Sequence, residues 1–296
     1  ADNAATTAMS KAAAGAMLPA MQELYGNPSS LHQKGREANM ALIGARETVA
    51  RCLNASPKEI YFTGCGTEAD NWAILHIISD AIEHHAVLHT LAKLEKQGFD
   101  VTYLPVHENG LVRLEELAAA IRPDTCLVTV MFCNNEIGTL QPVREIGALC
   151  REKGILFHTD AVQAVGHVPV DVEADNIDML SLSGHKFHAP KGVGALYCKK
   201  SIKLKNFIEG GAQERGRRGG TEAIPSILAM AAALEESCAH LQENMEKVTA
   251  MRDRLIAGLS QIPYSRCNGD PDHKAPGIVS FCFEGIEGES LLLRLD

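Results

Sequence analysis

Four features that would assign the chain to a particular class are missing from its sequence. The net charge of −9 leaves no positive excess, so direct binding to nucleic acid is not expected. No apolar run approaches the length of a membrane-spanning helix, and the acidic N-terminus has no signal-peptide pattern. The nine cysteines show no CxxC spacing, so neither a metal site nor a disulfide framework is predicted. We therefore expect a cytoplasmic protein in a reducing compartment, away from the membrane.

The sequence that remains has the composition of a globular protein. Its 296 residues are enough for one large domain or two modest ones, and 46% of them are hydrophobic. From residue 59 onward, short apolar runs alternate with segments of helical periodicity. Strands are expected at 59–63, 77–79, 101–105, 125–131, 155–159, 177–182 and 193–197, with helices after most of them. This alternation predicts an α/β fold with a mainly parallel central sheet and helices on both faces.

Both ends of the chain carry further expected elements. Ser10 is expected to cap a helix that runs to about Tyr25, and residues 35–53 have the pattern of an amphipathic helix. One long helical pattern at 224–259 is expected to link two domains, and it is followed by a strand at 278–283. We predict a large domain of residues 11–250 and a smaller, incomplete α+β domain of residues 1–10 and 251–296. A helix from Glu287 would stop without a cap, so the polypeptide is expected to continue past Asp296.

Polar residues follow several of the predicted strands. Ligands of parallel α/β folds bind at the carboxyl ends of the strands, so these residues are expected to form one site. Gly66 and Thr67 lie where a glycine-rich turn leads into a helix, and the free N–H groups of such a helix start bind anions. The other clusters are His84-His85, Asn134-Asn135-Glu136, Asp160 to Gln163 and Ser183 to Lys186.

Two lysines lie in the segment between the apolar runs 177–182 and 193–197. Lys186 directly follows Ser-Gly-His at the end of a predicted strand. An amine there can condense with a carbonyl cofactor if desolvation or neighbouring cations lower its pKa. Taken alone, the segment favours a polar hairpin whose lysines are solvated, and only the rest of the chain reverses this interpretation. Lys191 is the second candidate, but Pro190 and Gly192 indicate that it lies on a turn.

A lysine, a carboxylate, a stacking ring and an anion site are together the requirements of pyridoxal phosphate. Asp160 would pair with the pyridine nitrogen, Lys186 would form the imine and His84 would stack on the ring. The residues expected to hold the phosphate are Thr67, Ser183 and His185. The composite site is therefore predicted to bind pyridoxal 5'-phosphate.

A series of motifs in one order extends this interpretation to the whole chain. The motifs are Asp2-Asn3-Ala4-Ala5-Thr6-Thr7, Gly26-Asn27-Pro28-Ser29-Ser30, Glu83-His84-His85-Ala86-Val87, Asn134-Asn135-Glu136-Ile137-Gly138, His158-Thr159-Asp160-Ala161-Val162-Gln163, Ser183-Gly184-His185-Lys186, Gln213-Glu214-Arg215-Gly216 and Arg218-Gly219-Gly220-Thr221. In this order the chain resembles the cysteine desulfurases of the NifS/IscS type. They are pyridoxal-phosphate enzymes of fold type I in the class V aminotransferase group.

The resemblance implies an activity and further roles for individual residues. The family converts L-cysteine to L-alanine and passes the sulfur, through an enzyme persulfide, to iron–sulfur cluster scaffolds or tRNA-thiolation enzymes. It implies that Lys186 is the Schiff-base lysine and that His84 also transfers protons. Gln163 would donate to the phenolate oxygen of the cofactor, and Asn135 would lie near the cofactor and the substrate carboxylate. Thr221 would reach the phosphate of a neighbouring subunit, which implies a homodimer.

Two departures from the family pattern leave alternatives open. The persulfide cysteine and the arginine that binds the substrate carboxylate lie beyond the position of Asp296 in the family. The segment from Trp72 to Ile78 is also shorter than in relatives, by on the order of ten residues, the length of a crossover helix. The alternatives are a selenocysteine lyase, another class V aminotransferase, or a non-catalytic scaffold that retains the pyridoxal-phosphate site.

Overall fold

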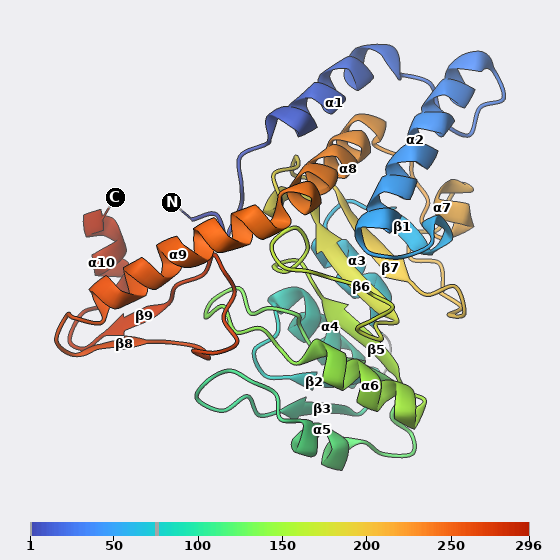
Figure 1. The fold of residues 1–296 in the computed structure, drawn as a ribbon. Coiled ribbons are helices and arrows are strands. Elements are labelled where there is room, and N and C mark those ends of the chain that lie inside the picture. The colour runs from blue at the N-terminus through green and yellow to red at the C-terminus, as the bar shows by residue number, and fades with distance from the viewer. Residues whose placement is uncertain (1, 75–76, 296) are drawn as a thin grey trace.

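The computed structural model describes residues 2–74 and 77–295 as an α/β fold around one seven-stranded sheet (Figure 1). The strand order is β1-β7-β6-β5-β4-β2-β3. Their bounds are β1 Ile60–Thr63, β2 Ile77–Asp80, β3 Val101–Leu104, β4 Leu127–Thr129, β5 Leu156–Asp160, β6 Met179–Ser183 and β7 Gly194–Cys198. Strand β7 runs antiparallel to both of its neighbours, whereas the pairs from β6 to β3 are parallel. The predicted mainly parallel sheet is therefore confirmed.

Helices cover both faces of the sheet because both faces are apolar. Alternate strand residues point to opposite faces, and Met179 packs with one hydrophobic cluster while Leu180 packs with the other. The Met179 cluster contains α3 (Gly66–Ala73) and α4 (His85–Glu95). The Leu180 cluster contains α1 (Lys11–Glu23), α2 (Gln33–Cys52), α5 (Leu114–Ala120), α6 (Val143–Lys153) and α8 (Ile224–Ala239). None of the described helices is both long and apolar enough to cross a membrane.

Local sequence explains where the N-terminal helices begin. The Ser10 hydroxyl accepts a hydrogen bond from the backbone N–H of Ala13 at 3.1 Å, which caps α1 as predicted.

The helical pattern at 224–259 differs from the prediction, because the single helix predicted there is broken at His240 into α8 and α9 (Leu241–Leu259). Helix α8 packs in the core, whereas α9 buries none of its residues. The apolar periodicity continues through the break, which is why it concealed the change of direction.

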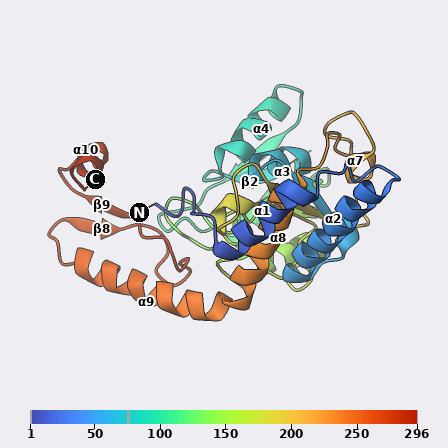
Figure 2. The same ribbon diagram turned by 90° about the horizontal axis from the view of Figure 1, so that it is seen from above.

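Helix α9 leads away from the layered part of the molecule to a small antiparallel sheet, as Figure 2 shows from above. This sheet pairs β8 (Ser265–Cys267) with β9 (Phe281–Phe283) and is followed by α10 (Gly288–Leu295). The expected strand at 278–283 is thus present in its last three residues. The division into residues 11–250 and a smaller domain stays a prediction. The shortened segment from Trp72 to Ile78 includes residues 75 and 76, which lie outside the described residues.

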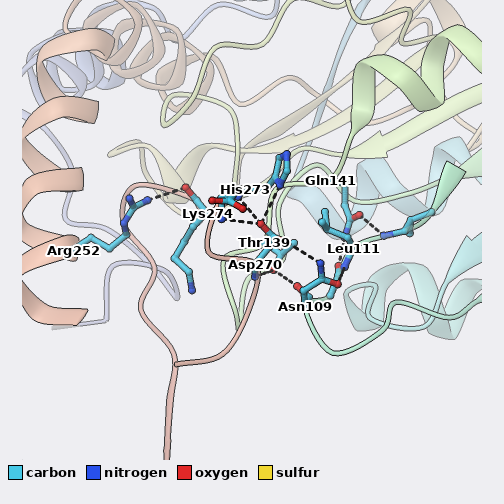
Figure 3. A network of polar contacts seen from close by, with 11 residues as sticks. Asn109, Leu111, Thr139, Gln141, Arg252, Asp270, His273 and Lys274 are labelled. Atoms are coloured by element: carbon cyan, nitrogen blue, oxygen red, sulfur yellow. Dashed lines mark hydrogen bonds and ion pairs between the residues drawn. The ribbon is translucent and has the colours of Figure 1, made fainter. Parts of the chain in front are cut away.

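The loop between β8 and β9 is joined to the main body by a buried polar network (Figure 3). Asp270 accepts a hydrogen bond from the Asn109 side chain at 2.8 Å, and its backbone N–H donates to the Thr139 hydroxyl at 3.1 Å. On the other side of the loop, Arg252 of α9 donates to the Lys274 carbonyl oxygen at 2.9 Å. These contacts connect α9, the β8–β9 loop and residues 109–141, so they fix the small sheet against the large one.

Asp270→Asn is expected to weaken this connection and to destabilise the protein at neutral pH. Burial alone would raise the pKa of Asp270, but hydrogen bonds from His273 and Asn109 hold it below its ordinary value. The carboxylate therefore contributes stability above the unfolded pKa of about 3.9, and this contribution is lost as the pH falls. We expect the free energy of unfolding to drop by roughly 1.5–3 kcal/mol at pH 7, measured by urea denaturation. The exposed neighbour Asp272 supplies the control, Asp272→Asn, and an equal loss in both variants would contradict the assignment.

Candidate active site

A cavity of about 440 Å³ lies at the carboxyl ends of β5 and β6, next to the first turn of α3. Nine of the ten predicted site residues line it: Gly66, Thr67, His84, Asn135, Asp160, Gln163, Ser183, His185 and Lys186. The tenth, Thr221, lies in a separate small cavity beside Glu214 and Arg218. The structure thus brings together residues that are spread over 120 positions of the sequence, and their roles stay predictions.

Lys186 follows β6 and extends into this cavity from a short 3-10 turn, Gly184–Lys186. Its amine donates to the carbonyl oxygens of Ala4, at 2.5 Å, and Ala5, at 3.1 Å. Burial lowers the pKa of Lys186, while the neighbouring carboxylates, Asp160 first among them, act in the opposite direction. The amine is therefore easier to deprotonate than a solvated one, which is what attack on a carbonyl carbon requires. Lys191, the competing lysine, is exposed and does not line the cavity.

Asp160 ends β5 and is 5% exposed. One carboxylate oxygen accepts the backbone N–H of Val162 at 2.9 Å. Burial raises the pKa of Asp160, whereas the Val162 N–H and the neighbouring His84 and Lys186 side chains act to lower it. A cationic group bound beside this carboxylate would be stabilised by it, because a buried anion without a cation is unfavourable.

His84, which is exposed, and Asn135, which is half-buried, also line the cavity. His84 is the N-cap of α4, and its Nδ1 accepts the Ala86 N–H at 3.1 Å. Because Nδ1 is an acceptor there, the neutral ring carries its proton on Nε2, which is free to exchange it with a ligand. Asn135 donates to Glu136 at 2.7 Å. The cavity lining therefore includes one group able to transfer a proton and one amide.

The start of α3 also lines the cavity, and its backbone N–H groups are of the kind that bind anions. Gly66 and Thr67 form its first turn, and a Cβ on Gly66 would come within 2.7 Å of Val162 and 3.1 Å of Ser183. Only glycine allows the helix start to approach the strand ends this closely. Ser183 and His185 also line the cavity, and the pKa of His185 is lowered by burial and by the two nearby lysines. Backbone N–H groups with these polar side chains suit a phosphate.

The N-terminal segment belongs to the site to an extent that sequence spacing did not predict. The Ala4 carbonyl accepts from Gln163 at 3.0 Å as well as from Lys186, and the Thr7 N–H donates to the His185 carbonyl at 3.0 Å. Ala4 and Ala5 therefore line the cavity. They participate through backbone carbonyls, so no side-chain pattern could have identified them; the only signal was the resemblance of the segment to a family motif.

Asp70 is a second cavity residue that the sequence reasoning missed. It is 1% exposed and lies on α3, four residues after Gly66 and three after Thr67. Residues at these spacings share one helix face, and this was the signal that could have identified it.

Two ion pairs hold the glycine- and arginine-rich loop of residues 209–221 in place. Glu214, 5% exposed, accepts two hydrogen bonds from Arg46, each 2.7 Å long. Arg218 donates to both carboxylate oxygens of Glu68 on α3, at 2.7 and 3.1 Å. Bidentate arginine–carboxylate pairs are strongly oriented. The loop is therefore a fixed structure beside the site, not a freely solvated segment.

Comparisons with known proteins agree with this geometry. The family model for the class-V aminotransferases matches residues 1–296. The chain is 52% identical over 306 aligned positions to a cysteine desulfurase IscS of Methanosarcina thermophila, and the alignment covers all of this chain and 76% of that protein. It is 45% identical to a cysteine desulfurase of Nostoc sp., again over all of this chain and 76% of the relative.

Solved structures show the same relationship. A NifS-like protein superposes with a TM-score of 0.95 at 40% identity, covering 98% of this chain and 83% of the other. A structure of SspA in complex with cysteine has a TM-score of 0.87 at 38% identity, covering 99% and 85%. The predicted fold type is therefore confirmed.

Proposed function

Because the chain belongs to the class-V aminotransferases and, within them, to the cysteine desulfurases, we propose that it binds pyridoxal phosphate and takes sulfur from L-cysteine to leave L-alanine. The observation that carries the proposal is one cavity that contains a desolvated lysine amine, a buried aspartate and a helix-start anion site. The solved complex of the relative SspA with cysteine supports the choice of substrate.

The cavity residues fit pyridoxal phosphate in two respects. The first turn of α3, with Thr67, Ser183 and His185, would hold the phosphate. Asp160 would pair with the ring nitrogen, and its burial makes a cationic partner favourable. When bound, the cofactor supplies a ring that accepts the electron pair released from the substrate α-carbon.

The chain's own side chains have distinct tasks in this proposal. Lys186 would bind the cofactor covalently, and on release would hold or return a proton at Nζ. It must first leave the Ala4 and Ala5 carbonyls. His84 would stack over the ring and move a proton at Nε2, the nitrogen left free by the Nδ1 cap. Gln163 would donate to the ring phenolate oxygen, and Asn135 would lie near the substrate carboxylate.

The activity is tested by incubating the cofactor-loaded protein with L-cysteine and a thiol reductant. We expect alanine and sulfide in equal amounts, because each sulfur removed leaves one alanine and the reductant frees the sulfur as sulfide. D-cysteine is the control and should give neither product. Transamination would instead consume the amino group and yield a keto acid, an outcome that would favour the aminotransferase alternative. A large preference for L-selenocysteine would favour the selenocysteine lyase.

We further propose that the sulfur leaves as a persulfide for a protein of iron–sulfur cluster assembly or of tRNA thiolation. The proposal follows the cysteine desulfurase family of the relatives. A thiolate of the enzyme would attack the sulfur of the bound cysteine, and the carbon–sulfur bond would break with its electron pair left on carbon, which takes up a proton to give alanine. Transfer of the outer sulfur of the persulfide to a second thiol would regenerate the enzyme thiol, so no oxidant is needed.

We also propose that the protein is a homodimer with composite sites. Helix α1 and the turn that follows it leave Leu18, Met21, Tyr25 and Leu31 between 58% and 91% exposed. Apolar side chains gathered in this way favour a protein partner. Thr221 does not line the cavity that contains Lys186 of its own subunit; it lies on a loop fixed by two ion pairs and would donate to the phosphate of the neighbouring subunit.

Thr221→Ala is expected to weaken cofactor binding about 10- to 150-fold, since a hydrogen bond to a charged group is worth roughly 1.5–3 kcal/mol. Cofactor titration, with the mass in solution measured in parallel, provides the readout. Mixed dimers of Thr221→Ala with Lys186→Ala subunits then test the arrangement. One site of the mixed dimer combines an intact Lys186 with an intact Thr221 from the neighbour, so half of the activity should return. No recovery in the mixed dimer, or a monomer that binds tightly, would refute the composite site.

A further inference from the structure

Asp70 is a buried carboxyl group whose two oxygens have no hydrogen-bond donor among the described residues. It is 1% exposed, lines the cavity next to Asp160, and neither of its oxygens accepts a hydrogen bond from any residue in the described parts of the chain. Buried carboxylates are normally paired with a cation or with several donors, because leaving water without such partners costs several kcal/mol. The position of Asp70 is therefore unfavourable for a negative charge.

The groups that face Asp70 do not supply the missing positive charge. From β5, the Nε2 atom of His158 lies 3.8 Å from Oδ1, but burial lowers the pKa of His158 to about 3, so this ring is neutral. Asp160, also on β5, is a like charge, and buried Glu83 is another acid that acts on the same group of carboxyls. Burial first, and then Asp160, raises the pKa of Asp70 well above its ordinary value, against the opposite effect of the neighbouring Ser181 hydroxyl. Lys186 and His84 act on Asp160 instead.

A row of hydrogen-bonding groups ends beside Asp70. The Thr129 hydroxyl is 2.7 Å from Nδ1 of His158, and Nε2 of the same ring is 3.0 Å from the Ser181 hydroxyl. Ser181 is the register partner of Asp160 on β6 and adjoins Asp70. If Asp70 carries a proton, its O–H can donate to Ser181, Ser181 can donate to Nε2, and Nδ1–H can donate to Thr129. Every group in the row then has a partner. An ionised Asp70 can only accept, so each hydrogen bond would have to reverse: Ser181 would donate to Asp70, Nε2–H to Ser181 and Thr129 to Nδ1.

We propose that Asp70 is an uncharged carboxylic acid that completes this row and leaves Asp160 as the single anion among the buried residues that the structure describes in the cavity lining. Asp70 is thus a positioning residue: it orients Ser181, the register partner of Asp160, and His158 on the same strand as Asp160, and it adds no second negative charge. One anion matches one cationic ring nitrogen, whereas two adjacent carboxylates would repel each other. The proposal depends on the proposed function only for the identity of the group that Asp160 binds.

The charge of Asp70 is tested on the cofactor-free protein, so this test is independent of the proposed function. An acid that stays protonated in the folded state and ionises in the unfolded state loses stability as the pH rises above about 4. We expect the unfolding constant of the wild type, divided by that of Asp70→Asn, to rise about tenfold per pH unit from pH 5 until Asp70 ionises. The control Asp171→Asn removes a carboxylate whose pKa is lowered by the Ala174 N–H, and its ratio should stay constant above pH 5. A constant ratio for Asp70→Asn would overturn the proposal.

The positioning role is tested by rescue with a conservative variant. Asp70→Ala removes the donor to Ser181 and is expected to weaken pyridoxal-phosphate binding about tenfold. Asp70→Asn retains an N–H donor and no charge, so it should restore binding and leave the pH titration of the cofactor absorbance unchanged around neutrality. Equal binding losses in the two variants, or a shifted titration in Asp70→Asn, would show that the charge or the shape alone matters and would overturn the role.

Discussion

Asp160→Asn should leave the protein folded and reduce alanine formation from L-cysteine by at least about a hundredfold, because charged groups aimed at a reacting centre are worth roughly 10²–10³ in kcat. An amide cannot keep the ring nitrogen protonated, so the ring loses its capacity to accept electrons. The isosteric change keeps the acceptor for the Val162 N–H, which is the one hydrogen bond from the described residues to this side chain.

Alanine production per bound cofactor is the measurement, with circular dichroism to verify folding. Asp175→Asn is the matched control, since Asp175 is also buried but lies outside the cavity and pairs with Arg144 at 3.1 Å. The control should retain near wild-type turnover in the protein that stays folded. Alanine production near the wild-type rate by Asp160→Asn would refute the pairing of Asp160 with the ring.

Lys186→Ala is expected to abolish turnover, with a loss of at least about 10²–10⁴-fold from missing proton transfer alone. The covalent contribution of the amine adds to this loss. Borohydride reduction of the wild type should fix the cofactor to Lys186, identified by peptide mapping. Lys191→Ala serves as the control because Lys191 is exposed on the turn five residues later, and it should keep both the label and the activity. A label on Lys191, or retained turnover in Lys186→Ala, would contradict the assignment of Lys186 as the lysine that binds the cofactor.

The charge of Asp160 should also influence the pH at which Lys186 loses its proton. The Asp160 carboxylate acts to raise the pKa of Lys186, against the effect of burial. Removing that charge in Asp160→Asn is therefore expected to lower the pKa of Lys186 further. Cofactor attachment needs the neutral amine, so the pH at which its rate is half-maximal should move downward in the variant.

Much of the fold followed from periodicity and from helix boundaries. The alternation of apolar runs and amphipathic segments predicted the parallel sheet, and Ser10 predicted the start of α1. The continuous pattern at 224–259 predicted one helix and was wrong at His240, where α9 leaves the core. Periodicity shows which side of a segment is apolar. It does not show how far the core that packs against that side extends.

The sequence by itself determined which chemical groups stand at the ends of the strands: Asp160 after β5 and Lys186 after β6, with Gly66 and Thr67 opening α3. The local sequence is enough to place these residues, because it indicates where a strand ends and where a helix begins, and ligands of such folds bind at the strand ends. The tertiary structure alone decided what surrounds these groups. It placed the Ala4 carbonyl on an amine 182 positions away, gave Asp70 no hydrogen-bond donor among the described residues, and put Thr221 outside the cavity that Lys186 lines. Such contacts join segments that are far apart in the sequence. The charge state of each group, and the cavity that it lines, therefore depend on tertiary packing.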